Sequence, residues 1–245
     1  MSATRSLLLA IAGAATAHAG PGITASRSVR MSFFPLLSGC GHPDHVALTF
    51  DDGPDPAATP HFLETLRARN VHATFFLLGS RVAMAQALTK EIAAAGHEIG
   101  VHGWVHRYLP LRGPAATHDD LKRARDIVAE TTGTVPWLFR PPYGVLSTAA
   151  IVAARRLGLK PVLWSNWGRE WTPGATAQSV CATLTADLAG GATVLLHDSD
   201  CTSPAGSWQA ALGALPLLLD ECDRRGLRVG KLSEHGTRWQ GRVSE

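Results

Sequence analysis

The sequence predicts a single-domain α/β protein built on a parallel sheet. From residue 46 onward, short runs rich in β-branched, aromatic and other apolar residues alternate with segments of helical length, as in proteins made of βα units. No internal repeat or low-complexity linker divides the chain, and 245 residues with 45% apolar content can bury one substantial core. Such units form either a closed barrel or an open doubly wound sheet, and the hydrophobic pattern does not distinguish the two.

Seven strands are expected, each a short apolar run next to a helical segment or a turn. They cover residues 46–50, 73–78, 98–102, 137–140, 161–165, 193–197 and 227–232. In both architectures the parallel strands end in loops at one edge of the sheet, and active sites form there. Polar residues that directly follow a strand are therefore the candidates for chemistry.

The helical segments carry apolar residues three or four positions apart and have recognisable ends. Thr117, followed by Asp120, and Thr176, ahead of Ser179, are expected as N-terminal caps. Pro216 lies inside the last long helical pattern, where a proline removes a backbone donor, so a kink or break is expected there. The glycines that follow helical patterns, as C′ residues do, are Gly96, Gly133, Gly158 and Gly226.

Charge and cysteine spacing exclude several classes of protein. The net charge is only +3 and no block of Lys and Arg is present, so no nucleic-acid partner is expected. The four cysteines lack CxxC spacing, which argues against a zinc knuckle or a redox dithiol, and buried free thiols are expected rather than disulfides. The sequence does not indicate an oligomeric state.

The N-terminus has features of an export signal. Arg5 precedes an apolar run at residues 7–17, and Ala17-His18-Ala19 resembles a cleavage site. We expect residues 1–43 to form a leader, either a signal peptide or an N-terminal apolar helix, ahead of a domain at 44–235 and a tail at 236–245. This favours a secreted or cell-envelope protein, with a mature N-terminus near Gly20, over a cytoplasmic one. The run is shorter than the roughly 20 apolar residues of a bilayer span, so no integral membrane span is expected.

Two adjacent carboxylates follow the first strand. Asp51 and Asp52 stand where a buried strand meets its loop, a costly position unless a cation or hydrogen-bond donors compensate the charges. The sequence Asp-Asp-Gly-Pro is also good turn chemistry, so this motif alone leaves both interpretations open.

Two histidines end the third strand, with the spacing of a ligand pair. On one helical turn, His102 and His106 would have Cβ atoms about 5–6 Å apart, close enough to share a metal ion. Two histidines and one carboxylate form a three-ligand site that leaves a position open for water. Together with Asp52, the pair therefore predicts a catalytic metal site.

Arg140 ends the fourth strand and His197 ends the sixth. Taken singly, Arg140 is better explained as a surface ion pair and His197 as a hydrogen-bonded core histidine. Four strands that deliver titratable groups to one rim are, however, the arrangement of a barrel active site.

The ordered set of motifs resembles the polysaccharide deacetylase family with the NodB-type domain, of the carbohydrate esterase family 4 type. The motifs are Thr49-Phe50-Asp51-Asp52-Gly53-Pro54, His102-x-x-x-His106, Arg140-x-Pro142-Tyr143 and Leu195-x-His197. The resemblance covers roughly residues 44–235 and implies a distorted (β/α)7/8 barrel, a single domain, with one divalent metal ion, usually Zn²⁺.

The same resemblance implies roles for these residues and a glycan substrate with N-acetyl groups. Asp52, His102 and His106 would bind the metal, Asp51 would be the general base oriented by Arg140, and His197 would be the general acid. The Tyr143 backbone would stabilise the oxyanion, while Leu195 and Trp171 would wall the acetyl pocket. The aromatic residues expected on the rim, some of them for packing alone, are Trp104, Tyr108, Tyr143, Trp167, Trp171 and Trp208.

Two positions depart from the family pattern. Gly103 stands where the family usually has Ser or Thr, so a hydrogen bond that braces the loop is expected to be missing. Glu170 stands where an Asp usually precedes the last Trp of the motif, so its extra methylene must be absorbed if it orients His197. These departures keep two alternatives open: a catalytically silent carbohydrate-binding barrel, and a metallohydrolase that attacks a non-sugar amide or a phosphoester.

Overall fold

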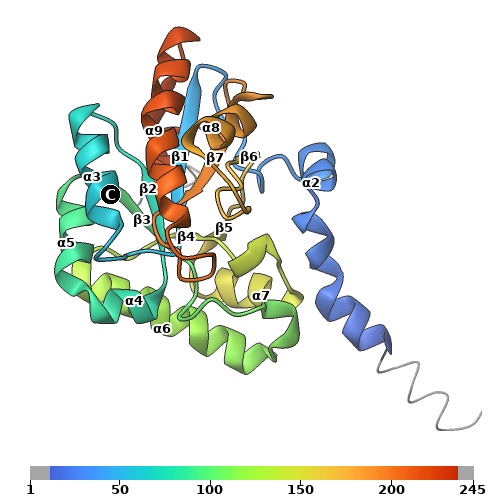
Figure 1. Cartoon of the computed structure of the whole chain (residues 1–245). Coiled ribbons are helices and arrows are strands. Elements are labelled where there is room, and N and C mark those ends of the chain that lie inside the picture. The colour runs from blue at the N-terminus through green and yellow to red at the C-terminus, as the bar shows by residue number, and fades with distance from the viewer. Residues whose placement is uncertain (1–11, 237–245) are drawn as a thin grey trace, which may run out of the picture.

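The computed structural model describes residues 12–236, and its centre is one curled sheet of parallel strands (Figure 1). The strand order is β5-β4-β3-β2-β1-β7-β6, with β8 also paired to β1. Within the described residues the strands are β1 His45–Asp51, β2 Thr74–Leu77, β3 Glu98–Val101, β4 Leu138–Phe139, β5 Lys160–Pro161, β6 Asn166–Trp167, β7 Thr193–His197 and β8 Arg228–Gly230.

Helices surround the sheet, so the fold is the predicted distorted α/β barrel in a single domain (Figure 1). The longer helices are α2 Arg27–Phe33, α3 Thr59–Ala68, α4 Gly79–Met84, α5 Gln86–Ala94, α6 Pro114–Thr132, α7 Thr148–Arg156, α8 Ala177–Thr185 and α9 Ser207–Arg224. Short 3-10 helices are η1 Gly20–Ala25, η2 Leu109–Leu111, η3 Pro142–Gly144 and η4 Leu232–Glu234. In the part of the chain that the structure describes, no helix is both long and apolar enough to cross a membrane.

β1 lies at the centre of the sheet, between β2 and β7, and all seven of its residues are buried. Its alternate side chains serve two cores, because successive side chains of a strand point to opposite faces. Val46, Leu48 and Phe50 join the cluster that packs against α3 and α9. Ala47 belongs to a different cluster, inside the barrel. Thr49 and Asp51 follow Ala47 on that inner face, which places the first acidic residue inside the barrel mouth.

The helix ends agree with the sequence prediction at most positions. Thr176 and Ser179 form a reciprocal capping box at the start of α8. All four predicted C′ glycines adopt positive φ, a conformation that glycine adopts without steric cost. The cysteines are free, as expected, although Cys222 alone is fully buried and Cys201 is exposed.

Three sequence predictions are wrong in detail. Thr117 does not cap a helix: α6 starts earlier, with Pro114 at its first position, and the Thr117 hydroxyl donates to the Gly113 carbonyl inside the first turn. Pro216 does not break α9, because buried apolar residues on both sides hold the helix against the core. The run at 161–165 is not one strand: only Lys160–Pro161 and Asn166–Trp167 pair with neighbouring strands.

The predicted leader at 1–43 and tail at 236–245 extend beyond the described residues, which begin at 12 and end at 236. Arg27, Arg30 and Leu37 of the expected leader contact the barrel at residues 163–165. The Leu163 amide donates to the Leu37 carbonyl at 2.7 Å, and the Thr193 hydroxyl donates to the Gly39 carbonyl at 2.9 Å. These hydrogen bonds attach residues 37 and 39 to the barrel.

Candidate active site

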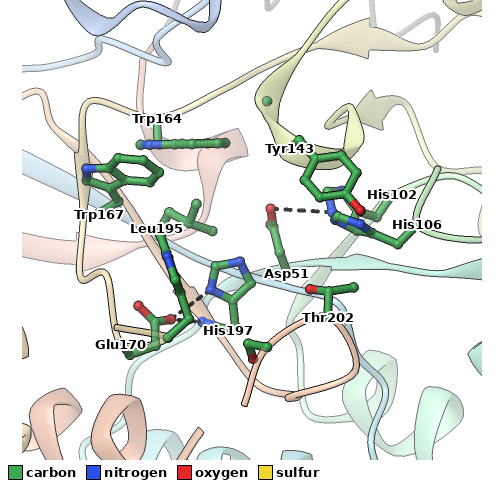
Figure 2. A pocket seen from close by; sticks show the side chains of 13 residues that line it. Asp51, His102, His106, Tyr143, Trp164, Trp167, Glu170, Leu195, His197 and Thr202 are labelled. Carbon is green, nitrogen blue, oxygen red and sulfur yellow. Dashed lines mark hydrogen bonds and ion pairs between the residues drawn. The ribbon is translucent and has the colours of Figure 1, made fainter. Parts of the chain in front are cut away.

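The predicted site residues meet at the carboxyl edge of the sheet. Asp51 at the end of β1 is in register with His197 at the end of β7. His102 directly follows β3, which lies two strands from β1, and Arg140 follows β4. Figure 2 shows Asp51 between the pair of histidines, His102 and His106, and His197, which contacts Glu170.

Asp52, His102 and His106 form the one group of metal-ligating side chains found among residues 12–236, with ligand atoms all within 4.8 Å of one another. Asp52 Oδ1 lies 3.4 Å from His102 Nε2 and 3.6 Å from His106 Nε2. Two ligands of a tetrahedral Zn²⁺, each about 2.0–2.1 Å from the ion, lie ~3.4 Å apart. The spacing therefore fits a divalent ion.

Hydrogen bonds orient these side chains for metal binding. His102 Nδ1 is 2.8 Å from the Arg140 carbonyl, to which it donates, so the lone pair of its Nε2 faces Asp52. The Thr202 hydroxyl donates to Asp52 Oδ2 at 2.7 Å. Asp52 Oδ1 is buried without a hydrogen-bond partner, the state of an oxygen that a cation would satisfy.

The protonation states of the group suit a cation as well. Burial and the nearby His102 lower the pKa of His106 to about 4, which leaves a neutral imidazole. Burial alone would raise the pKa of Asp52, but His102 and His197 outweigh it and hold that pKa well below its usual range. An ionised carboxylate and a neutral imidazole are the forms that bind metals.

The buried Arg140 side chain fixes the orientation of Asp51. Its Nη1 donates to Asp51 Oδ1 at 2.8 Å and to the Thr49 hydroxyl at 2.7 Å. The side chain of Arg140 is completely buried, and its other nitrogens donate to the carbonyls of Val162 and Leu163. Burial lowers the pKa of Arg140, an effect that Asp51 opposes. Asp51 Oδ2 is left facing His102 Nε2 at 3.8 Å.

Glu170 holds His197 by two hydrogen bonds to one oxygen. Glu170 Oε1 accepts from the His197 amide at 2.7 Å and lies 2.8 Å from His197 Nδ1. Burial alone would lower the pKa of His197, but the Glu170 carboxylate outweighs it and raises that pKa to about 9. His197 is therefore an imidazolium at neutral pH, with its Nε2 directed toward the cavity (Figure 2).

Gly168 makes room for the longer acidic side chain. A Cβ at Gly168 would lie 3.0 Å from Glu170 Oε2 and 2.8 Å from Val180. Glu170 is 3% exposed, so the extra methylene is accommodated inside the protein rather than at its surface. The geometry shows how a glutamate at this position holds the histidine.

The Gly103 departure is compensated by a residue far along the chain. Gly103 has a φ of +89°, a conformation that residues with side chains rarely adopt. The next amide, that of Trp104, donates to Asp120 Oδ2 at 2.7 Å. The loop between the two histidines is thus braced by a carboxylate of α6, in the absence of a Ser or Thr hydroxyl at 103.

The cavity has a volume of about 270 Å³ and is lined by carboxylates, histidines and aromatic rings. Its lining residues include Asp51, His102, His106, Tyr143, Trp164, Trp167, Glu170, Trp171, Leu195, His197, Thr202 and Ser203. Asp52 and Arg140 lie beneath this surface. Tyr143 is 56% exposed, and its ring contacts His106 edge-on at 4.3 Å between centroids.

Sequence reasoning missed Trp164, Thr202 and Ser203, and of the six aromatic residues expected on the rim, three do not line the cavity: Trp104, Tyr108 and Trp208. Trp164 belongs to the misassigned run at 161–165, and Thr202 lies in a polar loop five residues after His197, a weak signal. Trp104 does not line the cavity, because the Arg123 guanidinium stacks on its ring at 3.6 Å. Trp208 instead stacks on His61 at 5.7 Å.

Fold and site together define a class: α/β barrels with a candidate metal site and paired acidic and basic groups at the carboxyl edge of the sheet. The comparison with known sequences is consistent with this class, since the polysaccharide deacetylase family model matches residues 38–162. The chain belongs to the polysaccharide deacetylase family.

Two relatives are named as deacetylases of amino-sugar glycans. The chain is 35% identical over 197 residues to a Bradyrhizobium sp. chitooligosaccharide deacetylase. The match covers 77% of this chain and 89% of that protein. The chain is 34% identical over 192 residues to the peptidoglycan-N-acetylglucosamine deacetylase PgdA of Listeria monocytogenes. That match covers 76% of this chain, but the chain spans only 40% of the length of PgdA.

Solved structures share the fold. The Bc1960 peptidoglycan N-acetylglucosamine deacetylase superposes with a TM-score of 0.75 and 29% identity, covering 82% of this chain and 94% of that one. A family 4 acetyl xylan esterase from Clostridium thermocellum, solved with a cobalt ion, has a TM-score of 0.68 and 29% identity. It covers 77% of this chain and 88% of that one. These matches confirm the predicted barrel.

Proposed function

We propose that this protein is a metal-dependent N-deacetylase of an amino-sugar oligomer or polymer, of the chitin-oligomer or peptidoglycan type, and that it releases acetate. The observation that carries the proposal is that Asp51 and His197, at the ends of adjacent strands, both line a cavity that is also lined by His102 and His106 of the Asp-His-His group. Hydrolysis of an amide needs both a base for water and an acid for the leaving amine.

Asp52, His102 and His106 would hold the metal ion. A divalent ion there, for which Zn²⁺ is our choice, supplies Lewis acidity to the acetamide oxygen and to the attacking water. The buried, unpartnered Asp52 Oδ1 supports this assignment, because an unsatisfied carboxylate oxygen is costly.

Asp51 is the proposed general base. It accepts the proton of the attacking water through Oδ2, because Oδ1 already accepts from Arg140. The hydrogen bond from Arg140 fixes the orientation of the carboxylate, so Oδ2 is left to face the cavity. The oxygen of the attacked carbonyl gains negative charge, for which the backbone N–H of Tyr143 is the proposed donor.

His197 is the proposed general acid. Its raised pKa means that it carries a proton at neutral pH, and Glu170 holds the ring by Nδ1 so that Nε2 donates to the departing amine. The products are acetate and a free amino sugar. Leu195, Trp171 and Trp164 form the apolar wall against which the acetyl methyl would pack.

The substrate class is inferred from the lining of the cavity and from the relatives. The aromatic rings of Tyr143, Trp167 and Trp171 offer flat apolar faces beside polar groups, a combination that suits sugar rings. The Bradyrhizobium and Listeria relatives are named for chitooligosaccharide and peptidoglycan N-acetylglucosamine. We therefore assign an N-acetylated glycan as substrate.

Acetate release from N-acetylglucosamine oligomers and from peptidoglycan fragments tests the proposal. We expect release by the zinc-loaded protein, loss after chelation, recovery with Zn²⁺, and a loss of at least 100-fold in Asp51→Asn, the scale of general-base catalysis. Mass spectrometry that shows the loss of one acetyl group per modified sugar identifies the reaction and the substrate. Silence with every acetylated glycan, together with measurable glycan binding, would instead indicate a carbohydrate-binding barrel. Turnover of only non-sugar amides or phosphoesters would replace the substrate class.

A further inference from the structure

Four consecutive backbone carbonyls between β5 and β6 each accept a hydrogen bond from an arginine side chain. The donors and acceptors are Arg140 Nε to Val162 at 3.2 Å, Arg140 Nη2 to Leu163 at 2.8 Å, Arg30 Nη2 to Trp164 at 2.8 Å and Arg27 Nε to Ser165 at 2.7 Å. Arginine side chains thus replace a neighbouring strand as partners for the carbonyls of residues 162–165, while the Val162 and Ser165 amides still donate to the carbonyls of Phe139 and Thr193. This one-sided replacement explains why the apolar run is not one continuous strand.

Two of these donors, Arg27 and Arg30, come from α2, and Arg30 is the more deeply buried. It is 2% exposed, and its Nη1 also donates to the carbonyls of Thr24 and Ala25 at 2.6 and 2.9 Å. Burial, with Arg140 and Arg27 nearby, lowers its pKa to about 10, so it stays charged at neutral pH. Within the described chain no carboxylate lies at ion-pair distance from Arg30, so carbonyl oxygens compensate this buried charge.

The carbonyl that Arg30 holds belongs to a residue of the cavity wall. Trp164 lines the cavity and lies 5.6 Å from the ring of Trp167. A Cβ on Gly144 would lie 2.6 Å from the Trp164 ring, so Trp164 also packs tightly against the turn that carries Tyr143. Leu163, Trp164 and Leu195 form one buried cluster, against which Leu37 of the N-terminal segment packs.

We propose that Arg30 is a positioning residue for the acyl pocket. The segment from Gly20 to Gly39 sets the acyl-group selectivity, because it contacts Trp164 on the side away from the cavity. The guanidinium fixes the backbone of Trp164, and the ring of Trp164 limits how far an acyl chain extends past Leu195. The acyl specificity rests on the proposed function; the position of Trp164 is measurable without turnover.

The test compares Arg30→Gln, Arg30→Lys and the unmodified full-length protein. Arg30→Gln removes the charge and most of the fork of donors, whereas Arg30→Lys keeps the charge and reaches fewer carbonyls. We expect the preference for N-acetyl over N-propionyl glucosamine oligomers to fall about 10-fold in Arg30→Gln, within the range for one methylene in an apolar pocket. We expect a rise in KM greater than the fall in kcat, with Arg30→Lys intermediate.

A second measurement follows Trp164 directly. The near-ultraviolet circular dichroism spectrum of each form is compared with that of the same form carrying Trp164→Phe. The difference spectrum reports how rigidly, and in what surroundings, the Trp164 ring is held. We expect this difference to change in both Arg30 variants. Leu66→Ala is the matched control: Leu66 of α3 is buried in the core cluster between the sheet and α3 and α9, so its truncation lowers stability without contact with the pocket.

The outcomes separate a positioning role from general destabilisation. An unchanged Trp164 signal with unchanged acyl preference in Arg30→Gln would overturn the proposal, as would the same changes in Leu66→Ala. If Arg30→Gln does not fold, Arg30→Lys carries the same test. If the unmodified protein releases no acyl group from any glycan, the proposed function fails, while the Trp164 signal still decides whether Arg30 positions that ring.

Discussion

Glu170 and His197 show how one residue sets the charge of another. The carboxylate outweighs the burial of the imidazole and raises the pKa of His197 to about 9, above its ordinary value of about 6.5. A group whose pKa is raised on folding contributes stability that is fully present below its unfolded pKa and is lost as the pH rises through the folded pKa. This pair therefore stabilises the native protein at neutral pH and progressively less toward pH 9.

Glu170→Gln is expected to move the alkaline limb of the kcat profile to lower pH, because the neutral amide no longer favours the imidazolium. The same change should reduce the loss of unfolding free energy of the metal-free protein between pH 6.5 and 9. Urea titrations across this range and a pH profile of acetate release check both effects. Glu64→Gln, on the exposed face of α3, is the control. An identical alkaline limb in Glu170→Gln would show that His197 does not set it.

The sequence predicted which polar residues lie together where each one ends a strand. Asp51, His102, Arg140 and His197 lie together because parallel strands bring their carboxyl ends to one edge. It could not show that Gly168 makes the space for Glu170, or that Asp120 compensates for Gly103, because both depend on contacts between segments far apart in the chain. Their chemical roles stay part of the proposed function.

At the scale of elements, the start of β1 is joined to the end of the domain by two buried histidines. His45 Nδ1 lies 2.7 Å from His235 Nδ1, and His235 Nε2 donates to the Gly191 carbonyl at 3.1 Å. Burial and the neighbouring His45 lower the pKa of His235 to about 4. Burial, with Arg228, also lowers the pKa of His45, against the opposite effect of Glu234. Both imidazoles are therefore neutral at pH 7.

Acid should weaken the contact between His45 and His235. A histidine with a pKa lowered by folding contributes stability above its unfolded pKa of about 6.5, and that stability is lost as the pH falls toward 4. In His235→Gln the loss of unfolding free energy between pH 7 and 4.5 should be smaller than in the unmodified protein. Urea unfolding at both pH values measures it, with His118→Gln on α6 as the control. Equal losses in all three proteins would contradict the assignment.

Element boundaries were predictable only where the backbone pairs in the usual way. β1 and β7 match the apolar runs of the sequence, because strands buried on both faces are continuously apolar. The run at 161–165 is equally apolar, yet its carbonyls bond to arginines that come from α2 and from the end of β4. A hydrophobic pattern records burial and does not record the hydrogen-bond partner.

At the scale of the whole molecule, the candidate metal group joins two separate parts of the barrel. Asp52 follows β1 at the centre of the sheet, while His102 and His106 follow β3. The unfolded chain does not bring these three side chains together, so an ion bound to them stabilises the native state. Metal binding should therefore be visible in the unfolding of the whole domain, independently of any substrate.

Zn²⁺ added to the chelated protein should raise the midpoint of thermal unfolding. At 100 times its dissociation constant, a ligand of the native state adds about 2.7 kcal/mol. For a chain of this size each kcal/mol shifts the midpoint by about 2–4 °C, so we expect a rise of ~5–10 °C. Scanning calorimetry measures it. Asp52→Asn should lose most of the rise, whereas Cys201→Ser, which removes the exposed thiol near the site, should keep it. The same rise in Asp52→Asn would place the ion elsewhere and remove the basis for the proposed chemistry.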